Sequence, residues 1–420
     1  MTIGKPDISG LQTAISQAAA SPYVQTEITE TERQNLYQAC LMLSAHLETP
    51  LDRLSRSSFD FIPPVILRLA IDIGIFALFN KEDALLQEYT ISEIATRTKT
   101  NQGLIFRIVR FLITFGVFDA TPEGRCRANN FTKSFTPGNC AYDNVILLSG
   151  LSIPVFGRLP SYFRNNANKE PQSANAGVFQ DALSTDLHVY DWLGRTKDEF
   201  EAFHQLMATS QSWNEGAWTE LLPDKWFLQK FSSNSDNVTM VDVGGSSGKE
   251  LMAFMRRLPK PKARLVLQDI PHVVVGKHND PSTHGMPVDV IVSHNIEKMG
   301  HNFFNPQPVR GASLYILSRV LHNWPDKESA IILRNIHDAM NDQSTLLICD
   351  CVFQDKLGKV SYADAISDMI MMGTFSSLER SEQHFKELLQ SVGLRMHRIW
   401  RGPLGSTQAV LEVVRNRQVC

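Results

Sequence analysis

The sequence predicts an α/β protein with a doubly wound, mostly parallel sheet in its C-terminal half and helical regions, including a winged helix, in its N-terminal half. Two observations support this prediction. From residue 238 onward, short β-rich runs alternate with helical patterns, which is typical of a parallel sheet flanked by helices. The predicted strands are residues 239–243, 264–268, 288–293, 313–317, 345–351 and 408–414. Before residue 141, three helical patterns are followed by a hairpin signal.

These patterns divide the chain into four predicted regions. They are a helical arm (1–60), a winged-helix domain (61–140), a helical linker that helps to form a substrate pocket (141–235) and a ligand-binding catalytic domain (236–420). In the arm, residues 30–47 place Leu36, Leu43 and Leu47 on one helical face. We expect residues 1–60 to form a helical arm.

Residues 61–140 predict three helices and a hairpin. An apolar helix at 65–79 follows two prolines, a second helix begins at Thr90, and a third spans 101–115. Two β-rich runs then flank the turn signal Thr121-Pro122-Glu123-Gly124. Three helices followed by a hairpin are typical of a winged helix.

A winged helix can bind DNA, but the third helix here does not favour that function. A helix that reads a DNA groove exposes polar and basic residues. This helix is mostly apolar and carries only Arg107 and Arg110 as basic residues. A subunit interface is therefore favoured over a DNA-binding regulator, which stays as a third alternative.

Composition and charge are those of an ordinary globular protein. The 420 residues include 41 basic and 44 acidic side chains, a net charge of −3, and 43% apolar residues. Such a charge balance gives no excess of positive charge that would bind nucleic acid or an anionic membrane. Two or three domains fit the length.

The cysteines and the apolar segments favour a soluble, cytoplasmic protein. Six cysteines without a C-x-x-C pair do not resemble a disulfide framework, so a reducing compartment fits best. The first residues lack the pattern of a signal peptide. Apolar stretches such as 65–79 are interrupted by charges, here Arg68 and Asp72, so no membrane-spanning segment is expected.

A glycine-rich loop follows the first predicted strand of the catalytic domain. Gly244, Gly245 and Gly248 precede an amphipathic helix, where backbone amides can face a ligand. The spacing Gly-Gly-x-x-Gly differs from the dinucleotide motif, and Lys249 does not complete a P-loop. Asp269, at the end of the second strand, can accept both hydroxyls of a ribose. The glycine-rich loop and Asp269 together indicate an adenosine-type cofactor.

Four motifs resemble those of the plant-type, caffeate-like O-methyltransferases, and most closely the fungal members that act on secondary metabolites. The motifs are residues 244–248, 268–273, 301–304 and 321–326, and the resemblance covers about residues 60–415. It implies a Rossmann-like methyltransferase fold, S-adenosylmethionine as cofactor, S-adenosylhomocysteine as product, and a homodimer formed through the winged helix. The cofactor-binding positions that it implies are Gly244, Gly245, Gly248, Asp269, Ile270, Asn302, Phe303, Ser318 and Arg319.

His322 is the predicted general base. It follows the strand at 313–317, and the next helix is expected to have Asp326 as its N-cap and Ile332, Leu333, Ile336, Ala339 and Met340 as its buried stripe. An imidazole with a pKa near 6.5 suits deprotonation of a hydroxyl group, which must then lie in line with the S–CH₃ bond. The resemblance implies that Asp350 and Glu379 orient this histidine. For Asp350, a strand-end acid that faces water is an equal alternative.

Three positions depart from the family pattern. Asn302 and Asn323 replace aspartates, and Ser318 replaces a basic residue. Loss of the acid after His322 would lower the pKa of the histidine and weaken it as a base. This opens a second function: a pericyclase, cyclase or dehydratase that binds S-adenosylmethionine as a fixed positive charge and transfers no methyl group.

An aromatic or polyketide-type small molecule is the expected substrate, in a mostly apolar pocket. The resemblance suggests contacts from Met207, Trp213, Asp368, Met369 and Met372, although methionine and aromatic side chains at helical spacing also occur in ordinary cores. No metal site is expected, because His294, His301 and His322 show no ligand spacing.

Overall fold

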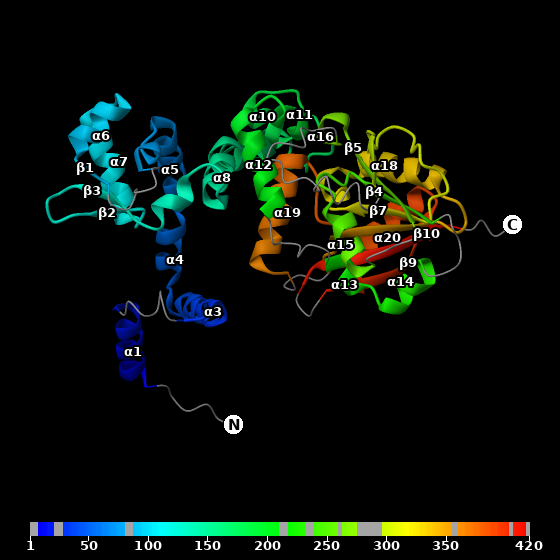
Figure 1. Ribbon diagram of the computed structural model, residues 1–420, viewed down its shortest axis with the longest axis horizontal. Coiled ribbons are helices and arrows are strands. Elements are labelled where there is room, and N and C mark those ends of the chain that lie inside the picture. Colours follow the sequence, from blue (N-terminus) through cyan, green and yellow to red (C-terminus); the bar gives the residue numbers. More distant parts are fainter. Residues whose placement is uncertain are drawn as a thin grey trace. The chain divides into compact units, whose positions relative to one another are not determined.

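The computed structural model describes residues 7–20, 28–79, 87–209, 217–231, 238–258, 263–274, 296–354, 360–402 and 406–416 (Figure 1). The chain forms two units, Met1–Pro63 and Pro64–Cys420. Each is described by itself.

The N-terminal unit consists of exposed helices. They are α1 (Ile8–Ala20), α3 (Glu30–Leu47) and α4 (Pro50–Ser57). Reciprocal capping boxes begin α3 at Thr29 and α4 at Thr49. None of the side chains described in this unit is buried. The predicted helix at 30–47 is confirmed, and its apolar residues Leu36, Leu41 and Leu47 are exposed.

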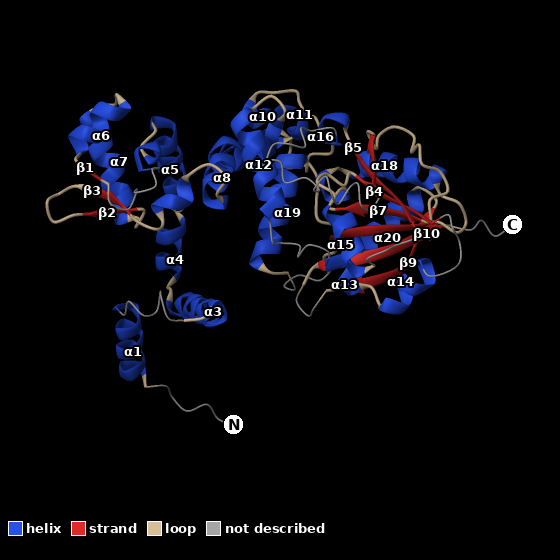
Figure 2. Cartoon of the chain, in the orientation of Figure 1, coloured by secondary structure: helices blue, strands red, loops and turns tan. Residues whose placement is uncertain are grey.

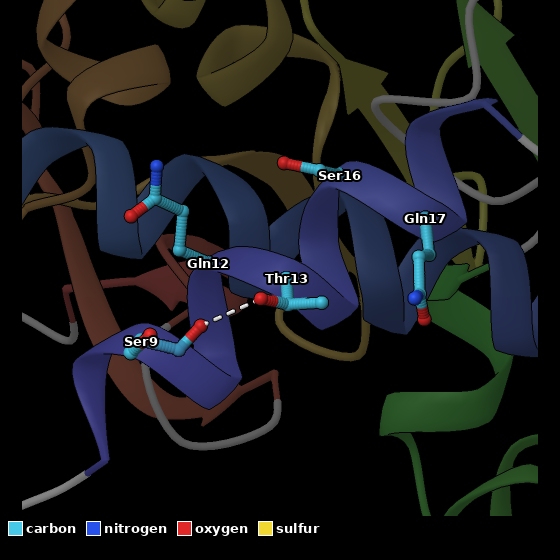
Figure 3. Close-up of a pocket in the computed structure, with 5 residues that line it drawn as sticks. All are labelled: Ser9, Gln12, Thr13, Ser16 and Gln17. Atoms are coloured by element: carbon cyan, nitrogen blue, oxygen red, sulfur yellow. Dashed lines mark hydrogen bonds between the residues drawn. The ribbon is translucent and has the colours of Figure 1, made fainter.

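A hollow on α1 is lined by Ser9, Gln12, Thr13, Ser16 and Gln17 (Figure 3). The Thr13 hydroxyl donates to the Ser9 carbonyl oxygen at 2.9 Å. None of these five side chains is charged, and one helix supplies the whole wall. The hollow therefore has no group suited to proton transfer.

The second unit begins with the predicted helices and hairpin. They are α5 (Ile62–Ile73), the 3₁₀ turn η1 (Phe76–Phe79), β1 (Glu88–Tyr89), α6 (Ile91–Thr98), α7 (Gln102–Thr114), β2 (Phe118–Ala120) and β3 (Cys126–Ala128). The three strands pair in the order β1-β3-β2. The predicted helix at 65–79 is wrong in one respect: it ends at Ile73, because Gly74 adopts a φ of +85° that a helix cannot continue.

Helices dominate the middle region. They are the 3₁₀ turn η3 (Thr132–Phe135), α8 (Cys140–Leu147), the π-helical turn η4 (Leu148–Ser152), α9 (Ile153–Asn165), α10 (Val178–Leu183), α11 (Val189–Leu193), α12 (Lys197–Thr209), α13 (Ala217–Leu221) and α14 (Asp224–Phe231). Trp213, a predicted substrate contact, lies outside the described residues.

One helix of this region was not singled out in the sequence analysis. The helix Cys140–Asn165 has 26 residues and contains an 18-residue stretch with a mean hydropathy of 1.3, so by length and composition alone it could cross a membrane. The sequence analysis considered only uninterrupted apolar runs and therefore did not identify this segment. In the structure α8 packs against α12, α9 packs against α10 and α19 (Tyr362–Phe375), and Asp143 is buried within the helix.

A seven-stranded sheet forms the rest of the unit (Figure 2). Its strands are β4 (Val238–Val243), β5 (Ala263–Asp269), β6 (Ile296–Gly300), β7 (Leu314–Ser318), β8 (Thr345–Cys351), β9 (Leu394–Arg401) and β10 (Gln408–Arg415), in the order β6-β5-β4-β7-β8-β10-β9. Strands β4 to β8 are parallel, and β10 pairs antiparallel with β8 and β9. The predicted mostly parallel sheet is confirmed.

Helices pack on both faces of the sheet (Figure 2). The C-terminal part of the chain forms α15 (Lys249–Arg257), α16 (Pro271–Val274), the 3₁₀ turn η5 (Leu321–Asn323), α18 (Asp326–Ala339), α19 and α20 (Glu382–Ser391). Of these, α18 and α20 share a core cluster with one face of the sheet, and α15 shares the other cluster with α13 and α14. Successive side chains of β4 point to opposite faces, so Val241 joins one core cluster and Met240 the other. Strand order reverses beside β4, which makes its carboxyl end the expected place for a ligand.

Two strands of this sheet were not predicted, and one prediction is not tested. The strand predicted at 288–293 lies outside the described residues, and β6 begins later, at Ile296. Strand β9 was missed because half of its eight residues are arginine or histidine; only Leu394 is fully buried.

Candidate active site

The glycine loop lies at the carboxyl end of β4. The amides of Gly244 and Gly245 donate to the Gln268 carbonyl oxygen on β5 at 2.8 and 2.9 Å. Gly244 and Gly248 have φ values of +73° and +80°, which favour glycine. Gly248 is the N-cap of α15, so the loop delivers the chain directly to a helix N-terminus.

Gly245 has no space for a side chain. A Cβ atom there would lie 2.5 Å from the Asp242 carboxylate and 2.6 Å from Leu267. At Gly244 a Cβ would meet Val320 at 3.2 Å and the Phe303 ring at 3.5 Å. The loop is therefore enclosed by β5, by the residues after β6 and by those after β7, as a binding loop at the sheet edge requires.

Asp269 ends β5 beside this loop. Its Oδ2 accepts from the Ser246 amide at 2.9 Å and its Oδ1 from the Ile270 amide at 2.7 Å. These bonds fix the carboxylate, and a carboxylate can accept more than two hydrogen bonds. The arrangement fits recognition of two vicinal hydroxyls, which is the predicted role of Asp269. Ile270, a predicted cofactor-binding residue, holds the carboxylate with its amide.

The residues after β6 approach the same loop. Asn302 uses its side-chain oxygen to accept from the Phe304 amide at 3.0 Å, so its Nδ2 is the group that can meet an adenine. Phe303 is held by Asn335, whose amide donates to the Phe303 carbonyl oxygen at 3.0 Å. The Phe303 ring thus lies beside Gly244, and Asn302 precedes it in the same segment.

Two buried acids lie under the loop. Asp242 is fully buried, and neither of its carboxylate oxygens has a hydrogen-bond partner among the described residues. Burial raises its pKa well above the usual value, and the nearby charges of Glu250 and Asp269 add to this. Glu250 accepts from the Ser318 hydroxyl at 2.8 Å, and its second oxygen is likewise unpartnered in the described part of the chain. Unpartnered buried acids fit a cofactor that carries an ammonium group.

His322 lies in the turn η5, just after β7. Arg319, with a φ of +52°, turns the chain there and donates its amide to the Cys349 carbonyl oxygen of β8 at 2.9 Å. His322 is 5% exposed, Asp350 1% and Glu379 5%. His322 Nδ1 lies 3.1 Å from Glu379 Oε1 and 3.8 Å from Asp350 Oδ1. The structure therefore brings the three predicted catalytic residues together.

The pKa values of the two acids shift in opposite directions. Burial raises the pKa of Asp350 to about 6, although the His322 charge opposes the shift. Burial also raises the pKa of Glu379, but the hydrogen bonds from His322 and Ser367 outweigh it and the net shift is downward. An ionised Glu379 can only accept, so His322 Nδ1 carries the proton and Nε2 has the free lone pair.

Arg380 holds the turn that carries His322. Its guanidinium, 1% exposed, donates to the carbonyl oxygens of Leu321 and Trp324, both at 2.8 Å, and to Ser329 Oγ at 3.1 Å. It also pairs with Asp326 at 2.9 Å. Arg380 thus binds the turn on both sides of His322. It directly follows Glu379 in the sequence.

Asp326 is not the N-cap that the sequence predicted. It is the first residue of α18, and Pro325 occupies the cap position without a side-chain bond. The Asp326 carboxylate instead binds His384 at 2.7 Å and Arg380, and these contacts, with the His384 hydrogen bond first, lower its pKa to about 2. The predicted buried stripe of this helix is confirmed.

The predicted substrate contacts are dispersed. Asp368 Oδ1 accepts from the Glu379 amide at 2.8 Å, and Ser367 Oγ donates to Glu379 Oε1 at 3.0 Å, so α19 holds Glu379 in place. Met372 is half-buried, and Met207 and Met369 are exposed. Their contact with a substrate stays a prediction.

An aromatic cluster beside the site was not predicted as such. His188 stacks on Trp324 with ring centroids 4.3 Å apart and an interplanar angle of 9°. Tyr190 and Phe375 complete the cluster. Trp324 belongs to the motif at residues 321–326, but no local sequence pattern distinguishes His188 from any other helix N-cap.

Known proteins resemble this chain over most of its length. A family model of the O-methyltransferase domain matches residues 172–395, more than half of the chain. O-methyltransferase mfmE of Annulohypoxylon moriforme is 30% identical over 392 residues, which are 91% of this chain and 90% of that protein. Demethylsterigmatocystin 6-O-methyltransferase of Aspergillus flavus is 29% identical over 345 residues, 82% of this chain and 83% of that protein.

Two solved structures share the fold. They are LepI in complex with SAM and a protein described as a pericyclic reaction enzyme, each with a TM-score of 0.75 and 24% identity. Both alignments cover 97% of this chain, and they cover 98% and 99% of the respective structures. With the family model and the 30% identical relative, these observations lead to one conclusion: the chain belongs to the O-methyltransferase family.

Proposed function

We propose that the protein transfers a methyl group from S-adenosylmethionine to a hydroxyl group of a small aromatic or polyketide-type secondary metabolite. The observation that carries this proposal is the hydrogen bond of His322 Nδ1 to Glu379, which leaves Nε2 as a base at the ligand-binding edge of the sheet. The relatives of this chain support the reaction type, since one of them is a demethylsterigmatocystin 6-O-methyltransferase.

The residues around the glycine loop fit S-adenosylmethionine. Asp269 would bind the ribose, Asn302 and Phe303 the adenine, and the backbone of the glycine loop the remainder of the nucleoside. Ser318 and Arg319 would complete the site after β7, where Ser318 orients Glu250. When bound, the cofactor supplies an electrophilic methyl on a sulfonium, and S-adenosylhomocysteine is the product.

His322 performs the proton transfer. A neutral hydroxyl is a poor nucleophile, so Nε2 accepts its proton as the oxygen attacks. The imidazolium that forms is stabilised by ionised Glu379, which already holds Nδ1–H. Asp350 lies 3.8 Å from the same nitrogen and, in its ionised form, also stabilises the imidazolium.

The substrate would be contacted by the side chains of Asp368, Met207, Met369, Met372 and Trp213.

The test uses the precursor that accumulates when the gene for this chain is deleted. The purified protein is incubated with it and with methyl-labelled S-adenosylmethionine. We expect labelled product and stoichiometric S-adenosylhomocysteine. Asp269→Ala should weaken cofactor binding at least about 100-fold in calorimetry, the cost of two hydrogen bonds to a charged group. Unchanged affinity would remove the ribose assignment.

A second function, pericyclase or dehydratase, is favoured by one observation. The position after His322 holds no carboxylate: Asn323 donates its amide to the Arg319 carbonyl oxygen at 3.0 Å. A similar structure is described as a pericyclic reaction enzyme. In the same incubation, a rearranged or dehydrated product with intact cofactor would establish this alternative.

The exposed helices of the N-terminal unit support a homodimer. Apolar side chains such as Leu47, Leu51 and Phe59 are exposed there, and so is Phe106 on α7. Large exposed apolar surfaces usually mark an interface. Sedimentation velocity should give the mass of two chains; the mass of one chain would contradict the homodimer. We propose a soluble, cytoplasmic protein.

A further inference from the structure

We propose that His322, Asp350 and Glu379 also form an inhibitory site for one divalent transition-metal ion of the Zn²⁺ type. This inference goes beyond methyl transfer, and only its inhibitory consequence rests on the proposed function. Among the described residues, these three side chains have donor atoms that all lie within 4.8 Å of one another.

The two distances from His322 are close to those around a small tetrahedral ion, and the two acids lie within 4.8 Å of each other. Zn²⁺ binds histidine nitrogen and carboxylate oxygen at about 2.0–2.2 Å, so two ligand atoms at the tetrahedral angle are about 3.4 Å apart. His322 Nδ1 lies 3.1 Å from Glu379 Oε1 and 3.8 Å from Asp350 Oδ1. Shifts of a few tenths of an ångström would bring both pairs to the ideal separation. A fourth position would remain for water.

The acids have unused acceptor atoms. Asp350 Oδ2 and Glu379 Oε2 are buried and have no hydrogen-bond partner among the described residues. Both carboxylate side chains are only 1% exposed. Buried carboxylate oxygens without partners are costly, and a cation between the two acids would remove that cost. These unpartnered oxygens indicate a ligand independently of the short distances within the cluster.

The neighbouring histidine–carboxylate pair lacks these properties. His384 Nε2 lies 2.7 Å from Asp326 Oδ2, but Arg380 binds the same carboxylate and supplies the cation. This pair has no second acid within the set of ligating groups found in the described residues. His384 is therefore a matched control.

Metal binding would reverse the tautomer of His322. In the proposed resting state Nδ1 carries the proton and Nε2 is the base. A metal ion on Nδ1 displaces that proton, and the neutral ring then holds its single proton on Nε2. The nitrogen that must accept the substrate proton is thereby blocked. Inhibition would follow without displacement of the cofactor.

The experiment titrates metal-free protein with Co²⁺, whose visible absorption reports Zn²⁺-type sites. We expect one Co²⁺ per chain with bands for nitrogen and oxygen ligands and without a thiolate charge-transfer band. His322→Gln and Glu379→Gln should weaken this binding at least about 100-fold, since even outer partners of a metal site contribute 10–100-fold. His384→Gln should bind as the wild type does.

Two further measurements separate the outcomes. Circular dichroism and S-adenosylmethionine affinity show that the variants are folded. No Co²⁺ binding by the wild type, a thiolate band, or binding that survives in both His322→Gln and Glu379→Gln would overturn the site. If Co²⁺ binds as expected but no methyl transfer is found, the proposed function fails and the metal site stands. If transfer occurs, Zn²⁺ should inhibit it with the affinity measured for binding, and cofactor affinity should stay unchanged.

Discussion

Asp350 and Glu379 both face His322 Nδ1, but they act differently at the scale of the single residue. Glu379 makes the hydrogen bond at 3.1 Å and is further held by Ser367 and by the Asp368 carboxylate, which accepts from the Glu379 amide. Asp350 is farther from His322, at 3.8 Å, and its pKa is raised to about 6. We therefore propose that the orienting role belongs mainly to Glu379.

Glu379→Gln should accordingly be more harmful than Asp350→Asn. The amide can still accept from Nδ1–H but does not stabilise the imidazolium, so we expect kcat to fall about 10²- to 10⁴-fold, the size of a general-base effect. Asp350→Asn should lower kcat less. Both variants should keep the wild-type affinity for S-adenosylmethionine in calorimetry. Equal losses would show that the two acids share the role.

Gly245→Ala should disrupt the glycine loop. The new Cβ would lie 2.5 Å from the Asp242 carboxylate and 2.6 Å from Leu267, and such overpacking costs about 1–3 kcal/mol. We expect lower thermal stability and loss of cofactor binding. Gly157→Ala in α9 is the control, because a Cβ there meets nothing within 4 Å. Equal behaviour of the two variants would contradict the steric account.

His188 should contribute a pH-dependent part of the stability. Burial lowers its pKa from 6.5 to about 4, so the unfolded chain binds more protons between these values. The contribution, at most about 3 kcal/mol, is complete above pH 6.5 and is lost as the pH falls toward 4. His188→Asn keeps an N-cap acceptor for the Tyr190 amide but does not titrate. Urea unfolding at pH 7 and pH 4.5 should show a smaller decrease for this variant; an identical decrease would contradict the prediction.

At the scale of elements, Arg380 connects the start of α20 to the turn η5. Its side chain binds two carbonyl oxygens of the turn, Ser329 of α18 and the Asp326 carboxylate. One planar cation therefore fixes the position of His322 relative to α18.

Arg380→Lys should release this turn. A lysine keeps the charge but cannot reproduce the fork of hydrogen bonds, so we expect a loss of about 2–4 kcal/mol in the free energy of unfolding and a lower kcat. Cofactor affinity should not change. Arg401→Lys, at the more exposed pair with Glu382, should stay within about 0.5 kcal/mol of the wild type. Equal stability of the Arg380 variant would show that the clamp contributes nothing.

Elements with strong local signals could be predicted from the sequence. The capping box of Thr90 and Glu93 begins α6, and the hairpin turn at 121–124 joins β2 to β3. The apolar periodicity predicted a helix that continues past residue 73, whereas the helix ends before Gly74. Periodicity carries no information on the positive φ of this glycine. Asp326 has the residue type of an N-cap but is bound by Arg380, 54 positions away. Long-range contacts of this kind have no local signal, as the stacking of His188 on Trp324 also shows.

At the scale of the whole catalytic unit, the sheet brings distant motifs to one edge. The order β5-β4-β7-β8 places the residues after each of these strands side by side: Asp269, the glycine loop, His322 and the end of β8 with Asp350. Two core clusters, one on each face, keep these strand ends in register. The motif order could be predicted from the sequence, whereas the distances between His322 and its acids depend on this packing.

The most direct test of the central claim is methyl transfer in His322→Gln. Wild type and variant are compared in a single turnover with methyl-labelled S-adenosylmethionine and the accumulated precursor. We predict labelled product from the wild type, none from the variant, and equal cofactor affinity in both. Wild-type transfer by His322→Gln, or an unlabelled rearranged product with the cofactor intact, would contradict the account.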